Sequence, residues 1–141
     1  MEVIPFKPEH LLAMDVQDAQ EFSRAFFAPE HLEALERCAS FTALAGGAPV
    51  MCFGWVEMYP TRALLWSVLA RQASGHMVAL TRIAKRLVDS LPHRRIEAEV
   101  DAQFQASRRW MEMLGLRCET ATPLRAYNAL GGDAYVYAKV T

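Results

Sequence analysis

The stretch ALLWSVLARQASGHMVALTRIAKRL, residues 63–87, changes character at Ser74-Gly75. Before that point, an apolar and β-prone run over residues 63–70 predicts a buried strand. After Gly75, apolar residues recur at the period of an amphipathic helix that ends before Pro92: Leu80, Ile83, Ala84, Leu87, Val88 and Leu91. The stretch therefore predicts a strand that passes through a short glycine-marked turn into a helix.

Two further β-prone runs precede this stretch, at residues 40–45 and 50–57. The turn sequences GGAP and YPTR separate the three runs, which predicts an antiparallel meander. Upstream, EVIPF predicts a first strand, and residues 9–26 predict either one helix or two. Pro29-Glu30 begins another helix, because proline suits a first helical turn.

The remainder of the chain alternates between the two periodicities. RIEAEV predicts a strand at 95–100, with Ile96, Ala98 and Val100 alternating against charged residues. FQASRRWMEMLG predicts a helix at 104–115 that Gly115 caps. LRCETA and AYVYAKV predict a closing pair of strands.

Composition limits the class of protein. The 141 residues, 52% of them hydrophobic, predict a single domain over residues 1–141. Fifteen basic residues balance sixteen acidic ones, which gives no general reason to expect a nucleic-acid partner. No apolar run reaches the roughly 18 residues of a membrane span, and we expect no signal peptide.

The cysteines and histidines predict neither disulfides nor a metal site. Cys38, Cys52 and Cys118 are odd in number and lack a CxxC spacing, which favours buried, reduced thiols in a cytoplasmic protein. The four histidines are scattered and not paired at zinc-binding spacing.

The order of these elements resembles that of the GNAT superfamily, the acyl-CoA-dependent N-acetyltransferases, along essentially the whole chain. RQASGHM lies where that family has its pyrophosphate loop, and Gln72 and Gly75 match the loop pattern. RRWMEMLGLRCE looks like the family's penultimate helix, and LRAYNALGGDAYVYAKV like its last hairpin. The resemblance implies an α/β (α+β) fold whose central mixed, mostly antiparallel sheet has about six to seven strands, flanked by about four helices.

The resemblance also implies acetyl-CoA as a cofactor. A helix N-terminus with unpaired N–H groups attracts a pyrophosphate, and glycine permits its close approach. Met77 stands where the pattern has a second small residue. The alternative is a strand-to-helix turn with Ser74 as its N-cap. The candidate cofactor-binding residues are Arg71, Gln72, Ser74, Gly75, His76 and Met77.

Catalytic residues are harder to find. Acetyl transfer needs a base for the amine and an acid for the leaving thiolate. The family typically has a tyrosine that acts as this acid, and this chain has Met111 at that position. Phe104 stands where the family often has an asparagine. Glu57 is the best candidate base, and a solvated surface charge is its alternative role.

Two functional hypotheses follow. The first is a degenerate GNAT-fold protein that resembles the GNAT-like proteins of tailed bacteriophages and acts in the virion or its assembly, with other virion proteins as partners. The second is an active acetyl-CoA-dependent acetyltransferase acting on a small amine or a protein amine. The first places the protein in the host cytoplasm or the virion, the second in the cytoplasm.

Overall fold

The computed structural model describes the backbone of residues 1–141 and every side chain except those of Phe22, Ala25 and Phe26. Its seven strands follow the order β1-β2-β3-β4-β5-β7-β6 and are mostly antiparallel, with four α-helices in the described chain. The predicted fold class is confirmed. None of the described helices combines the length and apolar character needed to cross a bilayer.

The contacts of the chain group into two compact units. Unit 1 comprises Met1–Val56 and Trp66–Leu80, and unit 2 comprises Glu57–Leu65 and Thr81–Thr141. Each unit is described by itself below. That the whole chain forms one domain stays a prediction.

The strands of unit 1 form antiparallel pairs. β1 (Glu2–Pro5) pairs with β2 (Ala39–Ala45), and β2 pairs with β3 (Ala48–Tyr59). Gly46 and Gly47 join β2 to β3 with φ angles of 57° and 82°. Positive φ at both positions is the requirement of a tight two-residue hairpin turn, which explains the glycine pair.

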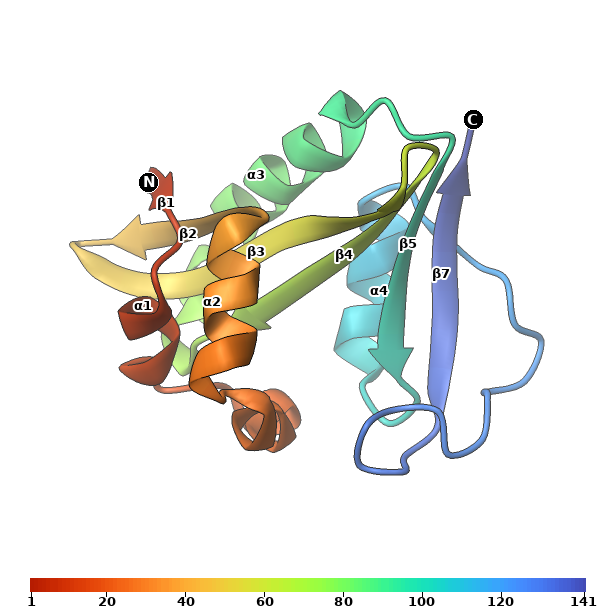
Figure 1. The fold of residues 1–141 in the computed structure, drawn as a ribbon, viewed down its shortest axis with the longest axis horizontal. Coiled ribbons are helices and arrows are strands. Elements are labelled where there is room, and N and C mark those ends of the chain that lie inside the picture. The colour runs from red at the N-terminus through yellow and green to blue at the C-terminus, as the bar shows by residue number, and fades with distance from the viewer. The chain divides into compact units, whose positions relative to one another are not determined.

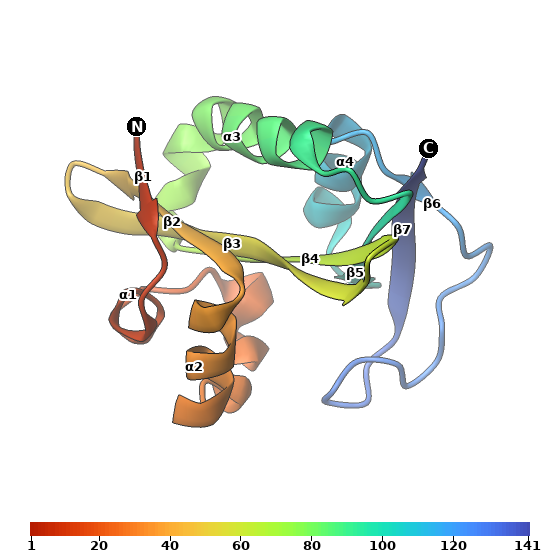
Figure 2. The ribbon, with the colours of Figure 1, turned by 45° about the horizontal axis from the view of Figure 1, so that its top comes forward.

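The helices of unit 1 pack on these strands. Of the two alternatives for residues 9–26, the structure has two separate helices, α1 (Pro8–Leu12) and the 3₁₀ helix η1 (Asp18–Phe26), and α2 (Pro29–Arg37) follows. Figure 2 shows α1 and α2 on one face of β2 and β3. Apolar side chains of α1, α2 and the segments next to them form a buried core with residues at β3 and at β4 (Arg62–Leu69). The core comprises Phe6, Leu11, Met14, Val16, Leu32, Cys52, Val68 and Ala70.

Unit 2 is built on β5 (Arg95–Asp101) and β7 (Ala134–Val140), which lie side by side as an antiparallel pair in Figure 1. β6 is only Arg117–Cys118, much shorter than the predicted 116–121 strand, and Leu124 meets β7 again in an isolated bridge with Ala134. α4 (Gln105–Met113) is followed by its C-cap Leu114 and then by the predicted capping glycine Gly115, whose φ of 93° suits the position after a helix C-terminus.

Strand β4 pairs with β5 in parallel over a short distance. The register joins Arg62, Ala63 and Leu64 of β4 to residues 95–97 of β5. The helix predicted after Gly75 is α3 (Met77–Ser90), which contributes its first turn to unit 1 and the rest to unit 2.

A chain of ion pairs crosses one face of unit 2. Glu97 is 6% exposed, and its carboxylate accepts hydrogen bonds from Arg62 and Arg95. Arg95 also donates to Glu119. Burial raises the pKa of Glu97, but the two arginines outweigh burial and hold the pKa below the usual carboxyl value.

The cysteines are free thiols, but the expectation that all three are buried is wrong. Cys52 is buried, and burial raises its pKa to about 11. Cys38 is half-buried, and Cys118 is exposed because β6 lies at the edge of the sheet.

We expect Gly54→Ala to destabilise the protein by about 1–3 kcal/mol or more, because the added Cβ overpacks the β2–β3 pair. That Cβ would lie 2.2 Å from the Ala39 carbonyl oxygen. Urea unfolding measures the effect. Gly75→Ala is the control, since a Cβ there meets nothing within 4 Å. Equal stability of the two variants would contradict the packing at Gly54.

We expect Glu97→Gln to cost about 2–3 kcal/mol at neutral pH, because charged hydrogen bonds to two arginines are lost. The depressed pKa makes this contribution present above the ordinary carboxyl range and lost as pH falls through the folded-state pKa. The difference from the wild type should therefore shrink on acidification. Glu112→Gln, on an exposed α4 position, is the matched control, and an equal loss there would rule out the network.

Candidate functional site

The predicted phosphate loop is a 3₁₀ helix, η2 (Arg71–His76), that leads directly into α3 at Met77. Gly75 is exposed, and a Cβ on it would meet nothing within 4 Å. Its φ is not in the left-handed region, so the backbone does not require glycine. The loop is therefore open to a ligand from the Gly75 side.

Arg71 is not available in the way that the phosphate hypothesis expects. Its guanidinium pairs with Asp15 at 3.2 Å and Asp18 at 2.6 Å. The hydrogen bond and charge of Arg71 hold the pKa of Asp18 below its usual value, so that carboxylate stays ionised at neutral pH. The positive charge nearest the loop is already balanced within the chain.

The other candidate residues show a mixed arrangement. Gln72, Ser74 and His76 are exposed, whereas Met77 is half-buried as the first residue of α3. The Ser74 hydroxyl donates to the Arg71 carbonyl oxygen at 3.2 Å. Ser74 therefore closes the 3₁₀ turn and does not cap α3, which corrects that part of the alternative interpretation.

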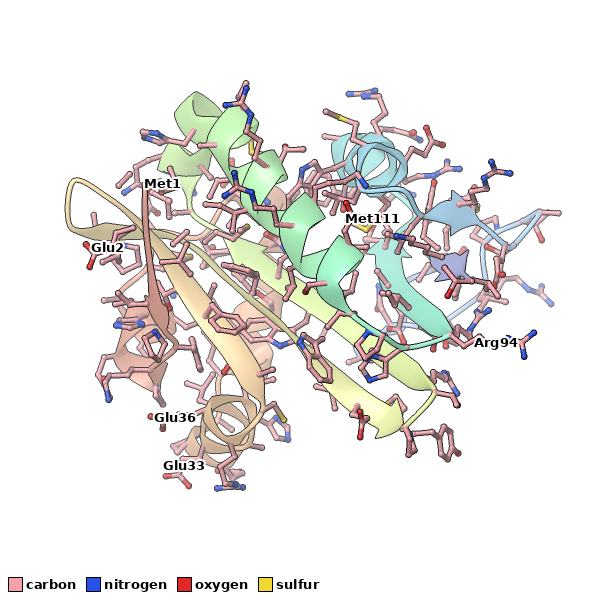
Figure 3. All side chains as sticks on the ribbon, turned by 90° about the horizontal axis from the view of Figure 1, so that it is seen from above. Met1, Glu2, Glu33, Glu36, Arg94 and Met111 are labelled. Carbon is pink, nitrogen blue, oxygen red and sulfur yellow. The ribbon has the colours of Figure 1, made fainter. Side chains whose placement is uncertain are left out.

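An open hollow of about 510 Å³ lies beside His76 in unit 1. Its lining includes the Gly46-Gly47 turn, Ala79, and Met1 and Glu2 from the start of the chain. Figure 3 labels Met1 and Glu2 at this end of β1. Glu2 adds a carboxylate, and no Lys or Arg lines this hollow.

These observations decide how well coenzyme A fits the loop. Its pyrophosphate needs close backbone approach and positive charge. Gly75 and the start of α3 meet the first need. The second is met only in part, because the start of α3 offers the partial charge of a helix N-terminus while Asp15 and Asp18 pair with the Arg71 guanidinium. The loop therefore fits a phosphate group better in shape than in charge.

Glu57, the predicted base, lies near the end of β3 and is half-exposed. One carboxylate oxygen lies 2.8 Å from Nε2 of His93, whose side chain is 2% exposed. The pair ties β3 to the loop between α3 and β5 within unit 2. Glu57 is therefore both half-exposed to solvent and paired with a buried histidine.

The two departures from the family pattern lie on α4. Met111, labelled in Figure 3, is 6% exposed and packs in the core. Phe104 stands at the N-cap of α4 and makes no side-chain cap hydrogen bond. A thioether and a phenyl ring have no proton to give, so neither position supplies an acid.

Sequence reasoning missed a carboxylate on β5. Glu99 lies two residues after Glu97 and so on the same face of the strand. Desolvation raises the pKa of Glu99, and the charge of Glu97 raises it further. A raised carboxyl pKa suits a general base. The alternation in RIEAEV marks both glutamates as solvent-facing, so only the tertiary environment distinguishes them.

Among the described side chains, no three His, Cys, Asp or Glu residues come together in a way that could hold a metal ion.

No protein-family model matches the chain, and no curated protein matches it in sequence. Solved structures do resemble it. Ard1 from Thermoplasma volcanium matches with a TM-score of 0.77 and 15% identity, over 99% of this chain and 97% of that one. A GNAT-family acetyltransferase from Bacillus anthracis matches with a TM-score of 0.70 and 18% identity, over 98% and 93% of the chains.

An aminoglycoside 6'-N-acetyltransferase complexed with coenzyme A matches with a TM-score of 0.67 and 13% identity, over 99% of this chain and 97% of that one. Identities this low establish shape and not chemistry. The chain has the GNAT fold.

Proposed function

We propose that this protein is a GNAT-fold protein that has lost acetyl transfer and acts as a binding protein in assembly. The observation that carries the proposal is that the Arg71 guanidinium of the loop is already ion-paired with Asp15 and Asp18. A dianionic pyrophosphate brought to this loop would have to compete with two carboxylates for the Arg71 guanidinium.

The buried Met111 supports the same proposal. The reaction has to protonate a leaving thiolate, and Met111 has no proton to give at the position where the resemblance expects a tyrosine. Its burial at 6% exposure shows that this position of α4 serves packing. The sequence resemblance to phage GNAT-like proteins supports the virion or its assembly as the setting, with virion proteins as partners.

We expect no binding of coenzyme A or acetyl-CoA to the wild type in calorimetry, and no thermal stabilisation. A ligand at a hundredfold excess over its Kd would stabilise the folded state by about 2.7 kcal/mol, which is readily measured. Gly75→Ala and Gly75→Asp form the control pair, since the first leaves the open loop nearly unchanged and the second adds a negative charge. Micromolar binding to the wild type and Gly75→Ala that Gly75→Asp abolishes would overturn the proposal.

The assembly role has its own test. Mass spectrometry of purified phage particles from the source of this sequence should detect the chain as a constant component, or detect it on assembly intermediates. If the chain is absent from both the particles and the assembly intermediates, the assembly role is wrong.

A second candidate function, acetyl-CoA-dependent acetyl transfer to an amine, is favoured by Glu99. A carboxylate with a raised pKa accepts a proton from an ammonium more readily than an ordinary one. Structural neighbours named as acetyltransferases, one of them complexed with coenzyme A, support the same class of reaction.

If this second function holds, the rate of acetyl transfer should rise with pH through an apparent pKa above the ordinary glutamate value. Glu99→Gln should lower the rate by about a hundredfold or more and remove that limb of the pH profile, because a general base is lost. Purified protein, acetyl-CoA and a panel of small amines suffice for the assay. Turnover that Glu99→Gln leaves unchanged would exclude Glu99 as the base.

A further inference from the structure

The two edges of β4 near its end have different partners. The Ala70 N–H donates to the Val50 carbonyl oxygen of β3 at 2.9 Å, so Ala70 directs its N–H toward β3. Backbone groups alternate along a strand. Ser67 and Leu69 therefore direct theirs to the opposite edge, which the register with β5 does not reach.

Residues Asp15–Gln20, here called the edge strap, occupy that opposite edge. Val16 forms an antiparallel bridge with Ala70. The Gln17 N–H donates to the Leu69 carbonyl oxygen at 3.0 Å, and the Arg71 N–H donates to the Asp15 carbonyl oxygen at 2.8 Å. The strap thus pairs with the last residues of β4 as a short extra strand would.

Gln20 completes the pairing with its side chain. Its Nε2 donates to the Ser67 carbonyl oxygen at 2.8 Å, and its Oε1 accepts from the Leu69 N–H at 2.9 Å. A primary amide offers the same donor and acceptor as a peptide group, so Gln20 stands in for the next residue of a strand. Gln17 Nε2 also donates to Gln20 Oε1, at 2.7 Å, and orients the amide.

The first half of the strap is anchored by buried side chains and by ion pairs. Val16 and Met14 are buried in the core of unit 1, with exposed fractions of 0% and 4%. Arg71 adds the ion pairs to Asp15 and Asp18. One segment therefore fills the strand edge and neutralises the loop that follows it.

We infer that the edge strap competes with any extended, amide-bearing ligand whose phosphate lies at the Arg71–Met77 loop, coenzyme A above all. The loop directly follows β4, so a chain that extended from a phosphate at the loop back along β4 would meet this edge. Amides of that chain would find the backbone groups of Ser67 and Leu69 already hydrogen-bonded to the strap. The inference rests on the proposed function, with which it shares the ion pairs of Asp15 and Asp18 with Arg71, and it adds the hydrogen bonds of the β4 edge.

Amide hydrogen exchange measured by NMR, together with coenzyme A titration, tests this inference. In Gln20→Ala, exchange at the Leu69 N–H should accelerate at least about tenfold, because that amide loses its acceptor. The Ala70 N–H serves as an internal control, since it pairs with Val50 on the other edge. The same variant should bind coenzyme A at least about tenfold more tightly than the wild type.

Gln105→Ala is the matched control, because Gln105 is an exposed glutamine on α4. If Gln20→Ala also accelerates exchange at the Ala70 N–H, the variant has lost its fold. The double variant Asp15→Asn with Asp18→Asn is then used in place of Gln20→Ala. That variant loosens the strap at Arg71 without touching β4, and it should accelerate exchange at the Arg71 and Leu69 amides.

Unchanged Leu69 exchange, or faster exchange without a gain in coenzyme A affinity, would overturn the inference. Micromolar binding of coenzyme A by the wild type with Leu69 still protected would do the same. Acetyl transfer by the wild type would count against the proposed function, whereas the contrast between Leu69 and Ala70 judges the strap alone.

Discussion

Each backbone group at the end of β4 needs a hydrogen-bond partner. This need determines how the rest of unit 1 is arranged. β5 satisfies β4 only over Arg62–Leu64, and the groups of Ser67 and Leu69 need other partners. Buried peptide groups left without partners cost free energy comparable to a lost hydrogen bond. The chain meets this need with residues 15–20, which brings residues 15–17 and the start of η1 against β4.

The same contact determines the electrostatics of the loop after β4. Since Asp15 pairs its carbonyl oxygen with the Arg71 N–H, its side chain and that of Asp18 lie beside the Arg71 guanidinium. The start of α3 still offers the partial positive charge of a helix N-terminus. Two nearby carboxylates oppose it, so an anion gains less here than at an uncharged glycine-rich loop.

Unit 2 shows how partners decide the chemistry of neighbouring carboxylates. Glu97 and Glu99 lie on one face of β5, yet their pKa values shift in opposite directions. Two arginines outweigh the burial of Glu97, whereas desolvation and the charge of Glu97 raise the pKa of Glu99. Glu97 is paired with two arginines and stays ionised, whereas Glu99, which is exposed, takes up a proton more readily than an ordinary glutamate.

The sequence by itself determined the element order and most element boundaries, because periodicity and turn residues are local properties. The helix after Gly75, the strand at 95–100 and the cap at Gly115 all follow from such patterns. The sequence also identified Met111 and Phe104 as positions without a proton donor, since side-chain chemistry needs no coordinates.

Only the tertiary structure decided which residues pair with the side chains of Arg71, Gln20 and Glu57. Their partners lie far away in sequence: Asp15 for Arg71, Ser67 and Leu69 for Gln20, and His93 for Glu57. The shortness of β6 was also hidden, since packing overrides local preference there, and only the structure chose between one helix and two over residues 9–26. The sequence gives the type of each residue. Its ion-pair and hydrogen-bond partners are decided only when segments distant in sequence come into contact.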